Sequence, residues 1–266
     1  MRLCPFFSGS SGNSVYVGSD NTHLLVDVGV ARKYMDEALN SVDLTGDDLS
    51  GILITHEHSD HIGGLGVFLR KYPVPVFATK KTINEILNWK YLGNVDTSLF
   101  HEVEPDSGFK IGDIEVVPFH ISHDAADPVA YRFIKGDKKL AVCTDLGCYD
   151  DYTVNNLKDL DTLLLEANHD IQRLQANPNY PYPLKMRILG EKGHLCNEMS
   201  GRLLCSVLND KLKKIYLGHL SRDNNIPELA FEAVRCEINM DHGPYKASDF
   251  DICIAKRDSV SECFEF

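Results

Sequence analysis

The chain has 266 residues, of which 43 % are hydrophobic and 25 % are charged. This composition is typical of a globular protein and suffices for one large domain or two small ones. The formal charge of −12 does not favour a general nucleic-acid binder, because such proteins usually carry a basic surface. No apolar run approaches the ~20 residues of a membrane span, and the N-terminus lacks the ~7–15-residue apolar stretch of a signal peptide. We therefore expect a cytoplasmic protein that does not cross a membrane.

The eight cysteines and the absence of linker-like segments indicate how the chain is organised. No two cysteines form a C-x-x-C pair, so we expect buried, reduced thiols. No Pro/Ser/Gly-rich tract, repeat or low-complexity run interrupts the sequence. The sequence therefore predicts a single domain over residues 1–266.

Hydrophobic periodicity predicts short strands with helices between them. A hairpin over 14–17 and 23–28 comes first, and a helix over 31–39 follows it. The later elements are strand 51–55, helix 61–71, strand 76–78, helix 81–89, a strand pair over 109–117, a hairpin over 130–134 and 140–144, strand 161–166, helix 197–208, strand 214–217, helix 226–238 and strand 251–255. Strands dominate without regular strand–helix alternation. This pattern favours packed sheets with helices outside over a barrel or a doubly wound sheet.

The segment THEHSDH at 55–61 follows the predicted strand over 51–55. It offers imidazole nitrogens and carboxylate oxygens, which suit zinc, manganese or iron(II). In a compact turn, His56 and His58 would face one way, and Asp60 and His61 another. Each pair could then hold one metal ion. A single loop cannot surround two ions, so other parts of the chain must supply further ligands.

Three residues of suitable chemistry follow the ends of other predicted strands. His123 lies in FHISHDAADP, Asp145 follows the apolar run LAVCT, and His219 follows KIYLG. A lone residue of this kind usually caps or stabilises a loop. Three of them, together with H-x-H-x-D-H, indicate a site that holds two metal ions.

H-x-H-x-D-H after an apolar strand, followed by a distant His, Asp and His, resembles the metallo-β-lactamase superfamily over nearly the whole chain. The resemblance implies an α/β fold, the αββα four-layer sandwich, with the site at one edge of its two sheets. It also implies two divalent metal ions, zinc or manganese, with iron also compatible. The implied ligands are His56, His58 and His123 for one metal, Asp60, His61 and His219 for the other, and Asp145 with a water or hydroxide as bridges. Asp27 in LLVDVG resembles a supporting aspartate of the family.

Further segments resemble the branch of tRNA 3′-processing endonucleases (RNase Z) and, most closely, the YycJ-like (WalJ-like) subfamily. They are FSGSSGNS, SHDAADPVAY, EANHD followed by YPYPLKMRI, GHLCN and GHLS. Cys196 stands where the subfamily usually has Ser. The resemblance implies a nuclease, most closely a 5′-exonuclease acting on DNA, in which metal-activated hydroxide attacks phosphate. Asp60 would orient this nucleophile, and Glu166 and His194 would assist the leaving group.

The loop SGSSGNS at 8–14 could contact the substrate, because small residues let backbone N–H groups approach an anion. Ser10, Ser11 and Asn13 are the residues expected there, and a tight turn between strands is the alternative. His169 in EANHD is a candidate for a phosphate contact or for support of the site. A structural histidine is the alternative for that position.

Three functions are compatible with these features. The first is a two-metal phosphodiesterase that acts on nucleic acid, which Glu166, His194 and the GHLS segment favour. The second is a two-metal hydrolase of a small substrate such as a cyclic phosphodiester, thioester or lactone, which the charge of −12 favours. The third is a non-catalytic partner protein in signalling, although all seven expected ligands are present. The sequence does not indicate the oligomeric state.

Overall fold

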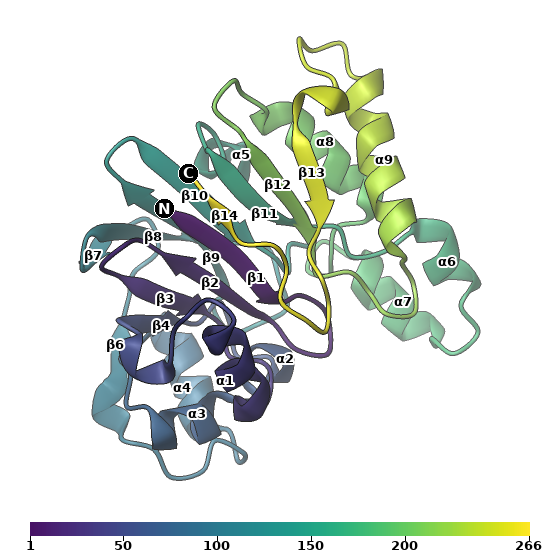
Figure 1. The fold of residues 1–266 in the computed structure, drawn as a ribbon. Coiled ribbons are helices and arrows are strands. Elements are labelled where there is room, and N and C mark those ends of the chain that lie inside the picture. The colour runs from purple at the N-terminus through teal and green to yellow at the C-terminus, as the bar shows by residue number, and fades with distance from the viewer. The chain divides into compact units, whose positions relative to one another are not determined.

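The computed structural model describes residues 1–266, which divide into two compact units (Figure 1). Unit 1 comprises Met1–His120, Ala125–Lys138 and Lys256–Phe266, and unit 2 comprises Ile121–Asp124 and Lys139–Ala255. A single domain over the whole chain stays a prediction. None of the helices combines the length and the apolar composition needed to cross a bilayer.

A seven-stranded mixed sheet forms the centre of unit 1. In spatial order its strands are β14 (Phe264–Glu265), β1 (Arg2–Phe7), β2 (Ser14–Gly18), β3 (His23–Val26), β4 (Gly51–Leu53), β5 (Val76–Ala78) and β6 (Phe100–Glu102). The pairs from β14 to β3 are antiparallel, and the pairs from β3 to β6 are parallel. The predicted first hairpin is confirmed, with Tyr16 opposite Leu25.

Helices α1 (Arg32–Asn40), α3 (Leu65–Lys71) and α4 (Lys80–Asn88) contribute to the core of this unit. On α1, Met35, Ala38 and Leu39 are spaced as one buried stripe, which is the pattern of a helix that packs by one face. Figure 1 shows the three helices gathered on one side of the sheet. Short 3₁₀ turns at Gly46–Asp48 and Thr97–Leu99 complete the connections.

The helix predicted over 61–71 is in fact two helices, α2 (Ser59–Ile62) and α3. The break falls at Gly63–Gly64. The Gly64 N–H donates to Val28 O at 2.9 Å, which lies outside the helix. A Cβ at Gly64 would lie only 1.9 Å from Val30 O, so this close approach requires glycine. The packing of the helix start against the 28–30 segment therefore interrupts the predicted helix.

Unit 1 also contains an antiparallel meander of β7 (Phe109–Ile111), β8 (Ile114–His120) and β9 (Val129–Lys135). It confirms the strand pair predicted over 109–117. The turn between β7 and β8 has Gly112 at φ 55°, a left-handed conformation that glycine adopts without strain. The Tyr131 hydroxyl on β9 donates to Ile54 O at 2.8 Å, just before the THEHSDH segment.

Unit 2 is built on four parallel strands, with helices in the connections. The strands are β10 (Lys138–Cys143, of which Lys138 belongs to unit 1), β11 (Thr162–Glu166), β12 (Lys214–Gly218) and β13 (Asp251–Ile254). The helices are α5 (Asp151–Asn156), α6 (Ile171–Ala176), α7 (Tyr182–Leu189), α8 (Asn197–Val207), α9 (Pro227–Met240) and the 3₁₀ turn Ala247–Asp249. In Figure 1, α8 and α9 run next to each other beside β12 and β13.

This half of the chain alternates strand and helix regularly, contrary to the sequence-based expectation. Helices α5, α6 and α7 were not predicted from the sequence, so the connections between the strands of unit 2 appeared irregular. Parallel pairing requires crossover connections of about a dozen residues or more, usually with a helix, and unit 2 follows this rule. Because parallel strands all end at one edge, the polar residues that follow β10, β11 and β12 are brought to the same edge of the sheet.

Replacing Tyr131 with Phe tests how firmly the β9 strand holds the segment before THEHSDH. The substitution leaves the buried Ile54 carbonyl without its hydroxyl donor, at a cost of about 1–3 kcal/mol. Urea unfolding followed by circular dichroism measures this loss. Tyr91→Phe is the matched control, because Tyr91 is 67 % exposed and should change the free energy of unfolding little. Equal stability of both variants would contradict the assigned role.

Candidate metal and catalytic site

The THEHSDH segment forms a tight group of rings in unit 1. His56 and His61 are fully buried, and their ring centroids lie 4.1 Å apart. The His58 ring lies 4.6 Å from that of His56, edge to face. His61 Nε2 lies 3.5 Å from Asp60 Oδ2. The structure therefore brings together the four metal ligands predicted within this segment.

Asp27 orients the His61 ring through a hydrogen bond to Nδ1. It follows β3 in a left-handed conformation, at φ 64°. One carboxylate oxygen accepts from His61 Nδ1 at 2.7 Å and from the Thr55 hydroxyl at 2.8 Å, and the other accepts from Thr55 N at 2.9 Å. Burial raises the pKa of Asp27, and the contacts with His61 and Thr55 oppose this rise. Because Nδ1 carries the donated proton, Nε2 of His61 is left to bind a cation.

The 8–14 loop approaches the same ligands through Asn13. Its Nδ2 lies 3.2 Å from Asp60 Oδ2 and 3.1 Å from His61 Nε2, and its backbone N–H donates to Asp60 O at 2.8 Å. Asn13 is buried, whereas Ser10 and Ser11 are exposed at the loop tip. A substrate contact by Ser10, Ser11 or Asn13 stays a prediction. The contacts of Asn13 favour a supporting role.

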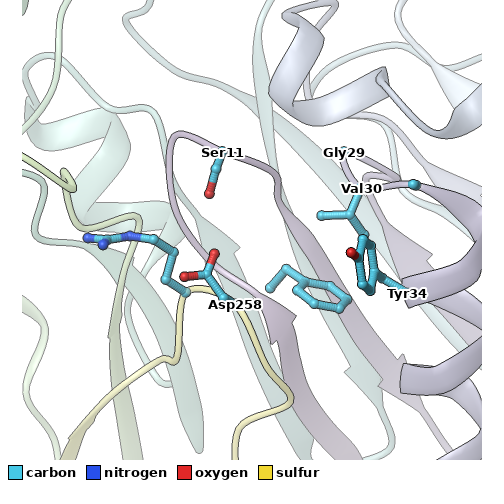
Figure 2. Close-up of a pocket in the computed structure, with 8 residues that line it drawn as sticks. Ser11, Gly29, Val30, Tyr34 and Asp258 are labelled. Carbon is cyan, nitrogen blue, oxygen red and sulfur yellow. The ribbon is translucent and has the colours of Figure 1, made fainter.

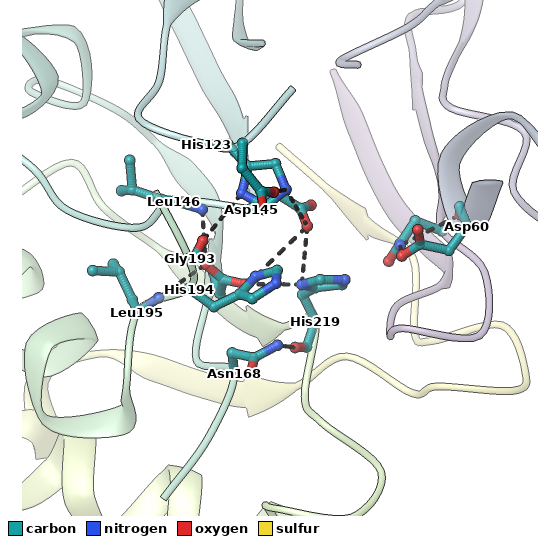
Figure 3. Close-up of polar contacts among 12 residues, drawn as sticks. Asp60, His123, Asp145, Leu146, Asn168, Gly193, His194, Leu195 and His219 are labelled. Carbon is teal, nitrogen blue, oxygen red and sulfur yellow. Dashed lines mark hydrogen bonds and ion pairs between the residues drawn. The ribbon is translucent and has the colours of Figure 1, made fainter. Parts of the chain in front are cut away.

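Glu166, the last residue of β11, is the centre of a polar network in unit 2. Figure 3 labels His194 and His219, which belong to this network. Its Oε1 accepts from His194 Nδ1 and from His219 Nδ1, each at 2.8 Å. Its Oε2 accepts from the backbone N–H groups of Leu146 at 2.8 Å and Leu195 at 3.2 Å. Both imidazoles therefore carry a proton on Nδ1 and keep Nε2 for other chemistry.

The charges in this network support one another. Burial alone would raise the pKa of Glu166, but the adjacent His194 and His219 outweigh it and lower that pKa to about 2. Burial would likewise lower the pKa of His194, but the Glu166 carboxylate outweighs it and raises that pKa above its ordinary value. These shifts favour an ionised Glu166 and the protonated form of the His194 ring. Such an imidazolium can give up a proton.

Asp145 and His219 hold strained backbone conformations at the strand ends, with φ 58° and 55°. Residues other than glycine rarely adopt this conformation, and it is concentrated at functional sites. Asp145 Oδ1 lies 3.5 Å from His219 Nδ1 and 3.9 Å from His123 Nε2. His123 Nδ1 lies 3.0 Å from Gly193 O, so its Nε2 points away from this carbonyl.

Two asparagines stabilise the backbone at and around His219; the sequence suggests such a role for Asn225 but not for Asn168. Asn168 Nδ2 donates to His219 O at 2.9 Å. Asn225 Nδ2 in turn donates to the carbonyls of Ala167 at 2.9 Å and Asn168 at 3.0 Å. For Asn168, its place just after β11 was the only signal, because an isolated Asn in a loop is common.

His169 lies beside these asparagines and is 1 % exposed. Its Nδ1 lies 3.3 Å from Asn168 Oδ1, and burial lowers its pKa to about 4. A neutral, enclosed imidazole favours support of the site over contact with a phosphate. The substrate contact predicted for His169 remains untested.

The donor chemistry fits divalent metals. In unit 2, one ligand atom each from Asp145, Glu166, His194 and His219 lies within 4.8 Å of the others. In His123, His194 and His219, Nδ1 faces an oxygen acceptor and Nε2 points away from it. This is the usual arrangement of metal-binding histidines. The predicted ligands divide into His56, His58, Asp60 and His61 in unit 1, and His123, Asp145 and His219 in unit 2. One site that joins the two sets stays a prediction.

Comparisons with known proteins agree with these features. A sequence model described as the metallo-beta-lactamase superfamily matches residues 8–190. The chain is 45 % identical over 223 residues to the "Exodeoxyribonuclease WalJ" of Streptococcus pneumoniae serotype 2, covering 84 % of this chain and 82 % of the relative. It is 44 % identical to the "Exodeoxyribonuclease YycJ" of Bacillus anthracis, covering 84 % and 83 %. The crystal structure of the metallo-beta-lactamase fold protein YhfI from Bacillus subtilis superposes with a TM-score of 0.70 over 98 % of each chain, at 16 % identity.

Removing the charge of Asp27 should weaken metal binding without removing a ligand. Asp27→Asn cannot accept the His61 Nδ1 proton as strongly, so we expect metal affinity to fall about 10- to 100-fold. Competition with a chelator, followed by metal analysis, measures this change. Asp20→Asn removes a carboxylate that is 78 % exposed and serves as the control. Unchanged affinity in Asp27→Asn would show that His61 needs no such support.

Proposed function

Because the chain belongs to the metallo-β-lactamase superfamily and, within it, to the WalJ/YycJ group, we propose that it is a metal-dependent phosphodiesterase that degrades DNA from the 5′ end. The superfamily resemblance predicted from the sequence is confirmed by the matching sequence model, and the predicted α/β fold class is confirmed by the similarity to the YhfI structure. The superfamily implies divalent metal ions, usually two. The "Exodeoxyribonuclease" relatives support DNA as the substrate. A cytoplasmic location remains part of the proposal.

The proposed ligand set is the one that the resemblance implied. The observation that supports it best is the oxygen acceptor on Nδ1 of His61, His123 and His219, which leaves each Nε2 for a metal. When bound, two zinc, manganese or iron(II) ions would activate water and offset the negative charge on the attacked phosphate. Asp60 and His61 would hold the same ion, and Asp60 would also orient the nucleophile.

The Glu166–His194 pair carries the proposal of phosphodiester chemistry. Hydrolysis breaks the bond between phosphorus and the 3′-oxygen, and this oxygen leaves with a negative charge. His194 would donate its Nε2 proton to that oxygen, because Glu166 holds Nδ1 at 2.8 Å and favours the protonated ring. The products would be a 3′-hydroxyl on one fragment and a 5′-phosphate on the other. A proton donor at this position suits an alkoxide leaving group.

A nuclease assay tests the proposed function. Purified protein reconstituted with Zn²⁺ or Mn²⁺ would receive single- and double-stranded DNA labelled at either end. We expect nucleotides to be released from the 5′ end, and Asp145→Asn to abolish the release. Asp137→Asn, which removes an exposed carboxylate in a turn, should cleave like the wild type. Hydrolysis of bis-p-nitrophenyl phosphate with DNA left intact would instead support the small-substrate hydrolase.

A second variant separates proton donation from metal binding. His194→Ala should keep its metal content and cleave DNA about 10²–10⁴-fold more slowly, the range of general acid–base catalysis. Hydrolysis of bis-p-nitrophenyl phosphate should be much less affected, because nitrophenolate leaves without a proton. Loss of metal in His194→Ala, or an equal loss of both activities, would overturn the assignment of His194 as the acid.

A further inference from the structure

A hollow of about 380 Å³ in unit 1 has an apolar side and a polar side. Its lining includes Phe7, Val30, Tyr34, Ser11, Arg257 and Asp258. Figure 2 shows Val30 and Tyr34 facing Ser11 and the Asp258 carboxylate across the hollow. Its volume lies in the range of small-molecule sites, roughly 300–1,000 Å³. Of the residues predicted to form the site, only Ser11 lines it.

The hollow lies directly beside the backbone that carries the predicted ligands. Gly29, part of its lining, donates to Asn13 O at 2.8 Å. A Cβ at Gly29 would lie 1.8 Å from Asp60 O, so this stretch is packed against the Asp60 backbone and requires glycine. The backbone around Gly29 therefore lies between the hollow and the Asp60 backbone.

Arg257 and Asp258 form the polar wall of the hollow. They belong to the C-terminal segment, which is hydrogen-bonded to the N-terminal strand β1. Ser261 N donates to Pro5 O at 2.9 Å, and Lys256 N donates to the Ser261 hydroxyl at 2.9 Å. A Cβ at Gly9 would lie 3.0 Å from Arg257 Cγ, so the 8–14 loop rests on the Arg257 side chain. Asp258 is thus held beside Ser11 by contacts within unit 1.

These walls match the surface of a nucleobase. A base has apolar faces that stack on aromatic rings, and Tyr34 is 52 % exposed and available for stacking. Guanine, cytosine and adenine carry an exocyclic amine that can donate a hydrogen bond to a carboxylate, whereas thymine carries none. Arg257 adds a positive charge for the flanking phosphate. The chain is strongly acidic as a whole, so such local contacts have to hold the strand.

We propose that this hollow binds the nucleobase of a nucleotide next to the cleaved linkage, with Tyr34 against its face and Asp258 accepting from its exocyclic amine. This proposal rests on the proposed function, since DNA must be the substrate. It adds a specificity that the metal centre cannot provide, because metal ions contact phosphate and not the base. The enzyme should therefore degrade ends bearing guanine, cytosine or adenine faster than ends bearing thymine.

The test compares four DNA strands of the same body whose two 5′-terminal nucleotides are both dG, dC, dA or dT. We expect kcat/KM for the dT end to be lowest, by roughly 5- to 100-fold relative to the best end, the range of one good base contact. Asp258→Asn should reduce this preference, and Tyr34→Ala should slow every end, with Tyr34→Phe restoring the rate. Asp20→Asn and Tyr91→Ala, at exposed positions away from the lining, are the controls.

Binding of free deoxynucleoside monophosphates, measured by calorimetry on metal-free protein, makes the test independent of cleavage. Tighter binding of dGMP than of dTMP, lost in Asp258→Asn, would support the hollow even if no DNA were cleaved, and the proposed nuclease function alone would then fall. DNA cleavage without base preference, together with Tyr34→Ala and Asp258→Asn variants that behave like the wild type, would overturn the base site and leave the nuclease standing.

Discussion

A buried carboxylate that accepts hydrogen bonds from two imidazoles is the interaction on which the proposed chemistry depends. Glu166 Oε1 fixes the proton on Nδ1 of both His194 and His219, at 2.8 Å each. A buried charge is costly unless it is paired, and two imidazoles with two backbone N–H groups provide that pairing. In the proposed mechanism, the His219 ring then binds a metal through Nε2 and the His194 ring donates a proton. Asp27 acts in the same way on His61 in unit 1.

Much of the fold could be read from the sequence, because apolar runs mark buried strands. The strands β2 to β5 and β7 to β13 lie close to their predicted positions. The strand β1 was missed because Pro5 interrupts its apolar pattern and the segment was considered only as a possible leader. The helix α7 was missed because it buries none of its side chains, so no apolar stripe revealed it. The break between α2 and α3 depends on contact with the 28–30 segment, which no local pattern encodes.

The candidate site was readable for a different reason. Parallel strands bring their ends to one edge, so polar residues after apolar runs point to a shared site. Within each unit the predicted residues do lie together, as His56, His58 and His61 show in unit 1. A residue that acts through a backbone carbonyl, such as Asn168, carries no such signal. Tyr34 and Asp258 are far apart in the sequence, and only the folded chain places both on one hollow.

In the proposed function, two metal ions held by histidines and aspartates of this chain support the cleavage of DNA. Titrating metal-free protein with Mn²⁺ or Zn²⁺, while measuring bound metal and the release of 5′-labelled nucleotides from DNA in the same samples, tests it most directly. We expect the release to reach its maximum as the bound metal approaches two ions per chain. Full cleavage by metal-free protein, or no cleavage with two ions bound, would contradict it.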